Sequence, residues 1–248
     1  MNALRKIALY IFGLYGWLVL VLCVLFGILS ALLVPTLHGR RKFVTAAAKG
    51  VFKLTGIHCQ ITGLDNIPDE HCVVIANHSS YLDGIILQAF LPPRFAFVIK
   101  GEMQKMPFVH FMLRRIGSKF VERFIAEGSA RDARAIVKSA QVGESIAFFP
   151  EGTFVLQRGL GRFRSGAFSA AIKGALPVVP VIIKGAREMM PANRLLPVPG
   201  RISVEILEAI PNSDPAYRST RKLSALARKR MLLGMDEPDL MAEDIESG

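Results

Sequence analysis

The stretch CVVIANHSSYLDGIILQAFL, residues 72–91, decides the fold class of this chain. Its first six residues, CVVIAN, form a short apolar run that predicts a strand buried on both faces of a sheet. The segment DGIILQAFL, which follows a polar turn, predicts a helix. A strand that leads into a helix is typical of an α/β fold, where functional side chains gather in loops just past the strand ends.

Strands and helices alternate along the rest of the chain in the same way. Helical patterns include residues 129–143, with Ser129 as the expected N-cap, and the basic stretch at residues 214–234. We therefore expect an α/β fold with a largely covered sheet and flanking helices. Short apolar runs predict the other strands at FAFVIK (95–100), SKFVER (118–123), SIAFFP (145–150), PVVPVIIKG (177–185) and RISVEIL (201–207).

The N-terminal part of the chain is long and apolar. No charged residue occurs from Ile7 to Leu37, and a helix needs only about 20 apolar residues to cross a bilayer. The run is also longer than the apolar core of a signal peptide. We predict a membrane-anchoring segment over residues 1–37, as one tilted helix or a helix pair. An amphipathic connector is expected at residues 38–57.

Basic residues flank this segment on both sides, and more of them follow it than precede it. Cationic flanks favour the cytoplasmic side of a membrane. We therefore expect an anchor in the inner (cytoplasmic) membrane of the cell, with the main domain facing the cytoplasm. The five that follow are Arg40, Arg41, Lys42, Lys49 and Lys53.

The net charge of +11 is unevenly distributed. Six of the 20 acidic residues lie after Arg230, so the tail at residues 235–248 is predicted to be acidic and disordered. The rest of the chain carries 31 basic against 14 acidic residues, which indicates a polyanionic partner. Beside a membrane anchor, an anionic membrane surface fits this charge better than nucleic acid does. No zinc-finger spacing or RNA-binding aromatic motif is evident.

The three cysteines are scattered, which argues against a disulfide framework. The pairs His58-Cys59 and His71-Cys72 could suggest a metal site. Adjacent residues on a strand point to opposite faces, so each pair could supply one ligand at most. No metal is expected.

His78 follows the predicted strand directly, and Asp83 lies about one turn further on. Imidazole is a base near neutral pH, and a carboxylate on its other nitrogen fixes the tautomer and stabilises the imidazolium. No G-x-S-x-G motif accompanies the pair, and Ser79 and Ser80 are too close along the chain to serve as nucleophiles. The pair either deprotonates a hydroxyl of the substrate or is a loop histidine held by a helix N-terminal aspartate.

The segment FFPEGTF (148–154) places Pro150, Glu151, Gly152 and Thr153 in a tight turn after another predicted strand. Backbone amides in such turns can bind phosphate or an oxyanion, although most such turns bind nothing. Nearby basic residues could bind a phosphate or simply form a solvated surface. They are Lys100, Lys105, Arg123, Arg158, Arg162 and Arg164.

Four blocks together resemble, in order and spacing, the motifs of the glycerolipid acyltransferase family. They are NHSSYLD, K-G-E-x4-P-x9-G-x5-R, FPEGT and VVPV, within about residues 50–210. The resemblance implies a catalytic domain at residues 58–234 with a central mixed sheet. It also implies acyl transfer from acyl-CoA or acyl carrier protein to the hydroxyl of a lysophospholipid, without a cofactor. The first candidate acceptor is 1-acyl-sn-glycerol 3-phosphate, which would give phosphatidic acid.

The resemblance also implies roles for single residues. His78 would be the general base and Asp83 its orienting partner, while Arg123 would bind the acceptor phosphate, with Lys100 and Lys105 as further candidates. Glu151, Gly152 and Thr153 would bind the acceptor beside it, and Pro180 would lie on the acyl-donor side.

Two departures from the family pattern concern the acceptor. Gly101-Glu102-Met103 stands where Glu-Leu is common, and Phe154 stands where Arg or Ser is frequent. The departures leave the acyltransferase chemistry untouched, and acylation of another lysolipid such as a lyso-ornithine lipid stays open. Two alternatives from other classes also stay open: a hydrolase that uses water, and a non-catalytic protein that binds lipid or tethers membranes.

Overall fold

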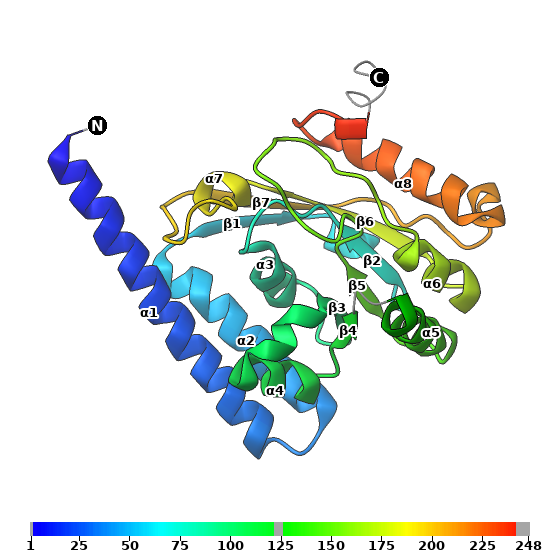
Figure 1. Cartoon of the computed structure of the whole chain (residues 1–248), viewed down its shortest axis with the longest axis horizontal. Coiled ribbons are helices and arrows are strands. Elements are labelled where there is room, and N and C mark those ends of the chain that lie inside the picture. Colours follow the sequence, from blue (N-terminus) through cyan, green and yellow to red (C-terminus); the bar gives the residue numbers. More distant parts are fainter. Residues whose placement is uncertain (1, 122–125, 242–248) are drawn as a thin grey trace.

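The computed structural model describes residues 2–121 and 126–241, with the backbone alone for residues 126–131. A seven-stranded sheet with the order β1-β7-β6-β2-β5-β3-β4 forms its centre (Figure 1). Strands β6 and β7 pair antiparallel and the other neighbours pair parallel, so the sheet is mixed, as expected. The strands are β1 (His58–Thr62), β2 (Val73–Ala76), β3 (Ala96–Lys100), β4 (Lys119–Val121), β5 (Ile146–Phe148), β6 (Val178–Lys184) and β7 (Arg201–Ile206).

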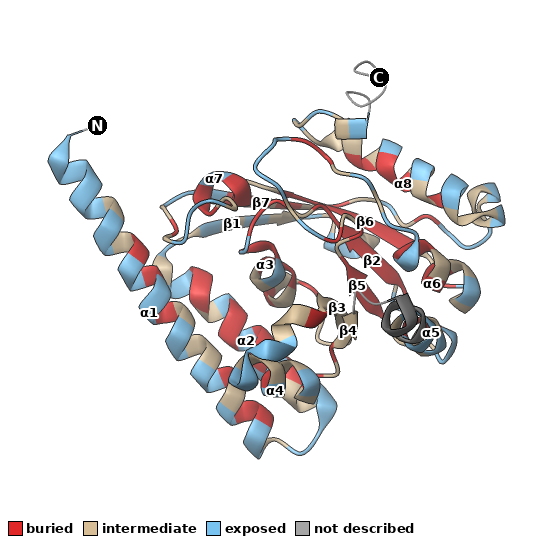
Figure 2. Cartoon of the chain, in the orientation of Figure 1, coloured by how far each residue is buried: buried red, intermediate tan, exposed pale blue. Residues whose placement is uncertain are grey.

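Helices cover both faces of the sheet. Residues Val74 and Ala76 of β2 pack with α2 and α3, whereas Val73 and Ile75 pack with α5, α6 and α8. All four are fully buried, and β2, β5 and β6 are buried strands in Figure 2. The sequence of β2 is a continuous apolar run because helices cover both faces of this strand. The helices are α1 (Ala3–Leu33), α2 (Leu37–Thr55), α3 (Asp83–Phe90), α4 (Pro107–Arg115), α5 (Ala126–Gln141), α6 (Gly166–Gly174), α7 (Ala186–Met189) and α8 (Thr220–Gly234), with a 3-10 helix η2 (Gly101–Lys105).

Two elements differ from the expectations. Strand β1 was not predicted, because it is an edge strand whose residues alternate between exposed and half-buried and form no apolar run. Ser129 is not an N-cap, because α5 is already helical at Ala126. Ala126 and Glu127 are strong helix formers, which favours this earlier start.

The N-terminal segment forms one continuous helix of 31 residues, α1, with α2 packed beside it (Figure 1). At 1.5 Å per residue α1 is about 46 Å long, and its most apolar window has a mean hydropathy of 2.7. Among the residues that the structure describes, α1 is the one helix long and apolar enough to cross a membrane, which indicates membrane association. Its buried side is formed largely by small residues, among them Gly13, Gly16 and Gly27.

A buried arginine of α2, Arg41, bonds residues that lie just before β4 and β5 of the sheet. Arg41 is 7% exposed at its side chain and donates hydrogen bonds to Ile116 O (2.8 Å) and Glu144 Oε1 (3.3 Å). Lys119 bonds the other oxygen of Glu144 at 2.9 Å. Burial acts to raise the pKa of Glu144, but hydrogen bonds from Lys119, Ser139 and Arg41 outweigh it and hold that pKa below its usual value.

Replacing Glu144 with glutamine should lower the free energy of unfolding by about 2 kcal/mol at pH 7, because Arg41 keeps its buried charge and loses its carboxylate. A carboxyl whose pKa is lower in the folded state stabilises the fold above its unfolded pKa of about 4.3. This stabilisation is lost as the pH falls through the folded pKa. The difference from wild type in urea unfolding should therefore shrink towards acidic pH. An equal loss at neutral and acidic pH would contradict this linkage; Glu70→Gln, at an exposed site, is the control.

The C-terminal segment differs from the expected disorder at residues 235–241. Asp236 pairs with Lys184, Glu237 with Arg187, and Asp239 with Arg228, so the acidic side chains neutralise cations of the folded domain. The rest of the predicted tail, with Glu243, Asp244 and Glu246, lies outside the described residues.

Candidate active site

The two motif-bearing strands lie side by side where the sheet topology changes direction. Strand β2 is followed by α3, which packs on one face of the sheet, and its neighbour β5 leads into α6 on the other face. Two adjacent parallel strands whose connections leave on opposite faces open a crevice at their carboxyl ends. The residues after β2 and after β5 therefore meet at the sheet edge where open α/β sheets generally bind their ligands.

Strand register brings His78 and Glu151 together. Ile75 lies opposite Phe148 in the β2–β5 ladder, and His78 and Glu151 each follow three residues later. They therefore stand at the same level beyond the sheet edge. The backbone N–H of His78 donates to Glu151 Oε1 at 2.7 Å.

His78 and Asp83 form a hydrogen-bonded pair that is shielded from solvent on the aspartate side. His78 Nδ1 lies 2.9 Å from Asp83 Oδ2, and the same oxygen accepts from the backbone N–H groups of Ser79 (2.6 Å) and Ser80 (2.8 Å). Asp83 is fully buried and is the first residue of α3, where the helix dipole favours a negative charge. A carboxylate on Nδ1 favours the tautomer with its proton there. Nε2 is then the ring nitrogen that can accept a proton.

Aromatic rings hold the imidazole in place. Phe149 stacks on His78 with ring centroids 4.3 Å apart, and Phe154 meets it edge-on at 4.6 Å. Tyr81 packs against Phe154 at 4.8 Å in turn. The side chain of His78 is left 18% exposed, so part of it remains accessible to solvent.

The Glu151 carboxylate is engaged on both oxygens by backbone groups. Besides the His78 N–H, it accepts from Gly161 N at 2.7 Å. A Cβ at residue 161 would lie 2.6 Å from Oε2, so only glycine allows this approach. Burial raises the pKa of Glu151, while the two N–H groups oppose the rise. In this geometry Glu151 joins the end of β2 to the loop after β5 instead of facing a substrate.

The other predicted residues are more dispersed. The Gly152 N–H is used within the turn, on Phe149 O at 3.0 Å, and Thr153 is exposed. Lys100 ends β3, the neighbour of β5, and thus lies at the same sheet edge as His78. Lys105 is exposed at the end of η2.

The remaining candidates do not join the pair. Pro180 is buried in β6 opposite Ile75, three residues inside the edge at which His78 stands. Arg158 is bonded to Glu188 at 2.6 Å, and Arg162 and Arg164 are exposed. Arg123 lies outside the described residues.

Sequence reasoning missed several supporting contacts. Asn77 exchanges two hydrogen bonds with the backbone of Ile183, at 2.9 and 2.7 Å, and so ties the end of β2 to β6. Ser80 Oγ donates to Met190 O at 2.7 Å. An asparagine directly after a buried strand was the available signal for the first contact, whereas nothing local indicates the second.

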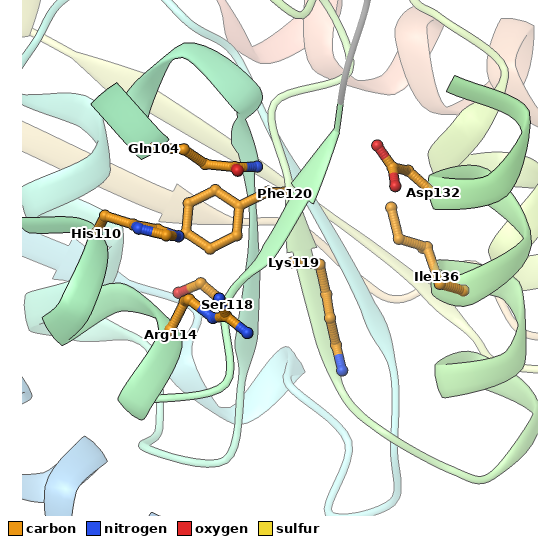
Figure 3. A pocket seen from close by; sticks show the side chains of 9 residues that line it. Gln104, His110, Arg114, Ser118, Lys119, Phe120, Asp132 and Ile136 are labelled. Carbon is orange, nitrogen blue, oxygen red and sulfur yellow. The ribbon is translucent and has the colours of Figure 1, made fainter. Parts of the chain in front are cut away.

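Two cavities lie near these elements. An apolar one of about 30 Å³ lies between α1, α2 and α3 and reaches Leu82 and Met190, which adjoin the His78–Asp83 turn. A larger one of about 300 Å³ lies between α4, β4 and α5, with His110, Arg114 and Lys119 in its lining (Figure 3). None of the predicted site residues that the structure describes lines the larger cavity. Among the described residues no three His, Cys, Asp or Glu side chains gather as a metal site would need.

A strand-end histidine oriented by a buried aspartate, above a mixed sheet, is an arrangement that can accept a proton from a hydroxyl group. The chain belongs to the Acyltransferase family, whose model matches residues 58–184. That range includes both motif-bearing loops and strands β1 to β6.

Individual relatives agree with the family assignment. A chloroplastic 1-acyl-sn-glycerol-3-phosphate acyltransferase of Brassica napus is 32% identical over 135 residues, covering 54% of this chain and 39% of that protein. The Pseudomonas aeruginosa 1-acyl-sn-glycerol-3-phosphate acyltransferase is 27% identical over 175 residues, covering 70% and 67%. The crystal structure of the Thermotoga maritima 1-acyl-sn-glycerophosphate (LPA) acyltransferase, PlsC, shares the fold, with a TM-score of 0.78, 24% identity and coverage of 93% and 95%. The chain spans only about half the length of several curated relatives, the Brassica protein among them.

Proposed function

We propose that this protein transfers an acyl chain from an acyl thioester to the free hydroxyl of 1-acyl-sn-glycerol 3-phosphate and forms phosphatidic acid. The observation that carries the proposal is the His78–Asp83 pair at the switch point of the sheet, with Nδ1 held and Nε2 left for a substrate proton. The names of the plant and bacterial relatives support the choice of acceptor.

In the proposed reaction the substrate supplies the nucleophile. Ser79 and Ser80 are 4% and 0% exposed, which leaves neither serine placed to attack a bound thioester. His78 Nε2 takes the proton of the acceptor hydroxyl as its oxygen attacks the thioester carbonyl carbon, and Asp83 stabilises the imidazolium. The C–S bond then breaks, and the thiol of coenzyme A or acyl carrier protein leaves with the proton from His78. General-base assistance of this kind is worth about 10²–10⁴-fold.

Three basic residues are assigned to the acceptor phosphate. Lys100 is the last residue of β3 and Lys105 the last of η2, while Arg123 follows β4 in the sequence. The Lys100 side chain is 42% exposed and therefore accessible. Gly152 and Thr153 adjoin the acceptor from the turn after β5. Glu151 acts in this scheme through the backbone of His78.

The membrane arrangement is proposed from α1 and its surroundings. Helix α1 anchors the chain in the inner membrane with the catalytic domain on the cytoplasmic side, and the basic surface rests on anionic headgroups. The apolar cavity at Leu82 links α1 to the site, which suits an acceptor drawn from the bilayer. Pro180, in the strand on the other side of β2, is assigned to the acyl-donor side.

The test follows the label of a radioactive acyl donor. Membranes with and without the protein receive labelled acyl-CoA or acyl-ACP, together with 1-acyl-sn-glycerol 3-phosphate, with another lysolipid, or with no acceptor. We expect labelled phosphatidic acid only when both the protein and the phosphorylated acceptor are present. Free fatty acid formed without acceptor would indicate a hydrolase. Label in another lipid would show that the acceptor is a different lysolipid. No label in any lipid would favour a non-catalytic tether.

A further inference from the structure

The C-terminal segment lies along the loop that carries the second motif. Residues 237–240, here called the strap, run beside residues 159–161 of the β5–α6 loop (Figure 1). Leu160 N donates to Pro238 O at 2.9 Å, and Leu240 N donates back to Leu160 O at 3.3 Å. This is a short parallel bridge between two segments far apart in the chain.

Glu237 reaches the backbone of the loop directly and through Arg187. Its carboxylate accepts from Gly159 N at 3.0 Å and from two nitrogens of Arg187, at 3.0 and 3.1 Å. Arg187 also donates to Val155 O (2.9 Å) and Gln157 O (3.0 Å). The side chains of Arg187 and Glu237 are only 9% and 15% exposed. Such shielded, bidentate pairs hold their geometry much better than surface pairs do.

Asp239 holds the next part of the loop through Arg228 of α8. The Arg228 guanidinium bonds Asp239, Leu160 O at 2.6 Å, and Gly161 O, and it lies over the ring of Phe163 at 5.3 Å. Leu160 is fully buried. The strap and Arg228 thus make five hydrogen bonds to the backbone of residues 159–161: one to Gly159, three to Leu160 and one to Gly161.

The fit between strap and loop is close enough to require a glycine. Gly159 has φ of +138°, and a Cβ there would lie 2.6 Å from Leu240 Cδ2. The loop therefore takes a backbone conformation in which a side chain is strained and the strap side chain occupies the space.

The loop held in this way is the one that contacts the catalytic pair. Gly161 N bonds Glu151, and Glu151 bonds the backbone N–H of His78. Phe154 of the same loop packs against the His78 ring. We propose that the strap completes the active site, with Glu237 and Asp239 as positioning residues that hold the β5–α6 loop, and through it Glu151 and Phe154, against His78. This inference rests on the proposed role of His78.

The test compares isosteric changes in the full chain. Glu237→Gln and Asp239→Asn weaken the two anchors, and Asp236→Asn is the matched control, because its 89% exposed side chain pairs only with Lys184 at the surface among the contacts described. We expect each anchor variant to lower kcat about tenfold, since small displacements of catalytic groups are costly, with both KM values changed less than about twofold. Asp236→Asn should change kcat less than about twofold.

A second measurement separates positioning from general stability. If the strap acts through Glu151, adding Glu237→Gln to a Glu151→Gln enzyme should lower kcat by less than about twofold more, because the two changes disrupt one network. The inference would be overturned if the two reductions in kcat multiplied in the double variant. It would also be overturned if Glu237→Gln changed kcat as little as Asp236→Asn does. If the Glu237→Gln variant does not fold, Asp239→Asn replaces it in both measurements. Turnover that persists in His78→Ala would contradict the proposed site itself, while the comparison with Asp236→Asn still judges the strap.

Discussion

Replacing His78 with alanine should lower kcat by at least about 10³-fold, and Asp83→Asn by about 10²–10³-fold, with little change in either KM. Alanine removes the nitrogen that is proposed to accept the hydroxyl proton. Asparagine keeps an oxygen for His78 Nδ1 and for the Ser79 and Ser80 N–H groups, so the turn should still form. What it removes is the negative charge that stabilises the imidazolium in the transition state.

The control for the aspartate change is Asp65→Asn, which makes the same substitution at an exposed site. Initial rates at saturating donor and acceptor give kcat, and thermal unfolding checks that each variant is folded. An Asp83→Asn enzyme that kept more than about a tenth of wild-type kcat would remove the carboxylate from the mechanism.

Glu151→Gln should lower kcat about 10²-fold while changing the melting temperature little. Glutamine has one acceptor oxygen, so it can satisfy the N–H of His78 or of Gly161 but must point an NH₂ group at the other. A donor facing a donor displaces the loop, and a displacement of about 1 Å near the reacting atoms is enough for a loss of this size.

The small change in stability follows from the pKa of Glu151. Burial raises this pKa above that of the unfolded chain, so the ionised carboxylate costs folding free energy at neutral pH. Removing the charge recovers that cost and offsets part of the lost hydrogen bond. The control is Glu188→Gln, an exposed carboxylate paired with Arg158 of the same loop. A large fall in melting temperature with normal kcat in the remaining folded enzyme would show that Glu151 serves the fold and not the site.

The parts of the site that sequence could predict are those encoded locally. His78 and Asp83 are five residues apart on a strand–turn–helix segment, so their hydrogen bond depends on one turn of chain. The contact between His78 and Glu151 depends instead on the pairing of Ile75 with Phe148 across the sheet. Motif spacing named Glu151, but register alone decides that its carboxylate meets the His78 backbone.

The two features that the sequence did not predict, strand β1 and the ordered segment around Glu237, also depend on contacts with distant parts of the chain. Strand β1 has no apolar run because it lies at the sheet edge and is covered only in part. The segment around Glu237 has the composition of a disordered tail, and its order comes from Arg187 and Arg228, distant in the chain. Composition reports what a segment can bury by itself, and not which buried cation it can neutralise.

The pairing of β1 with β7 determines when this protein can finish folding. His58 of β1 lies opposite Arg201 of β7. Strand β1, the first of this sheet to be synthesised, therefore gains its neighbour only after β7, the last of them, has been made. Strand β2 likewise needs β5 and β6, which are made much later. Pairings so distant along the chain form slowly and leave strand edges open meanwhile. Helix α1 precedes every strand of this sheet and needs no partner strand to associate with a bilayer, so the nascent chain can be held at the membrane well before the sheet is complete.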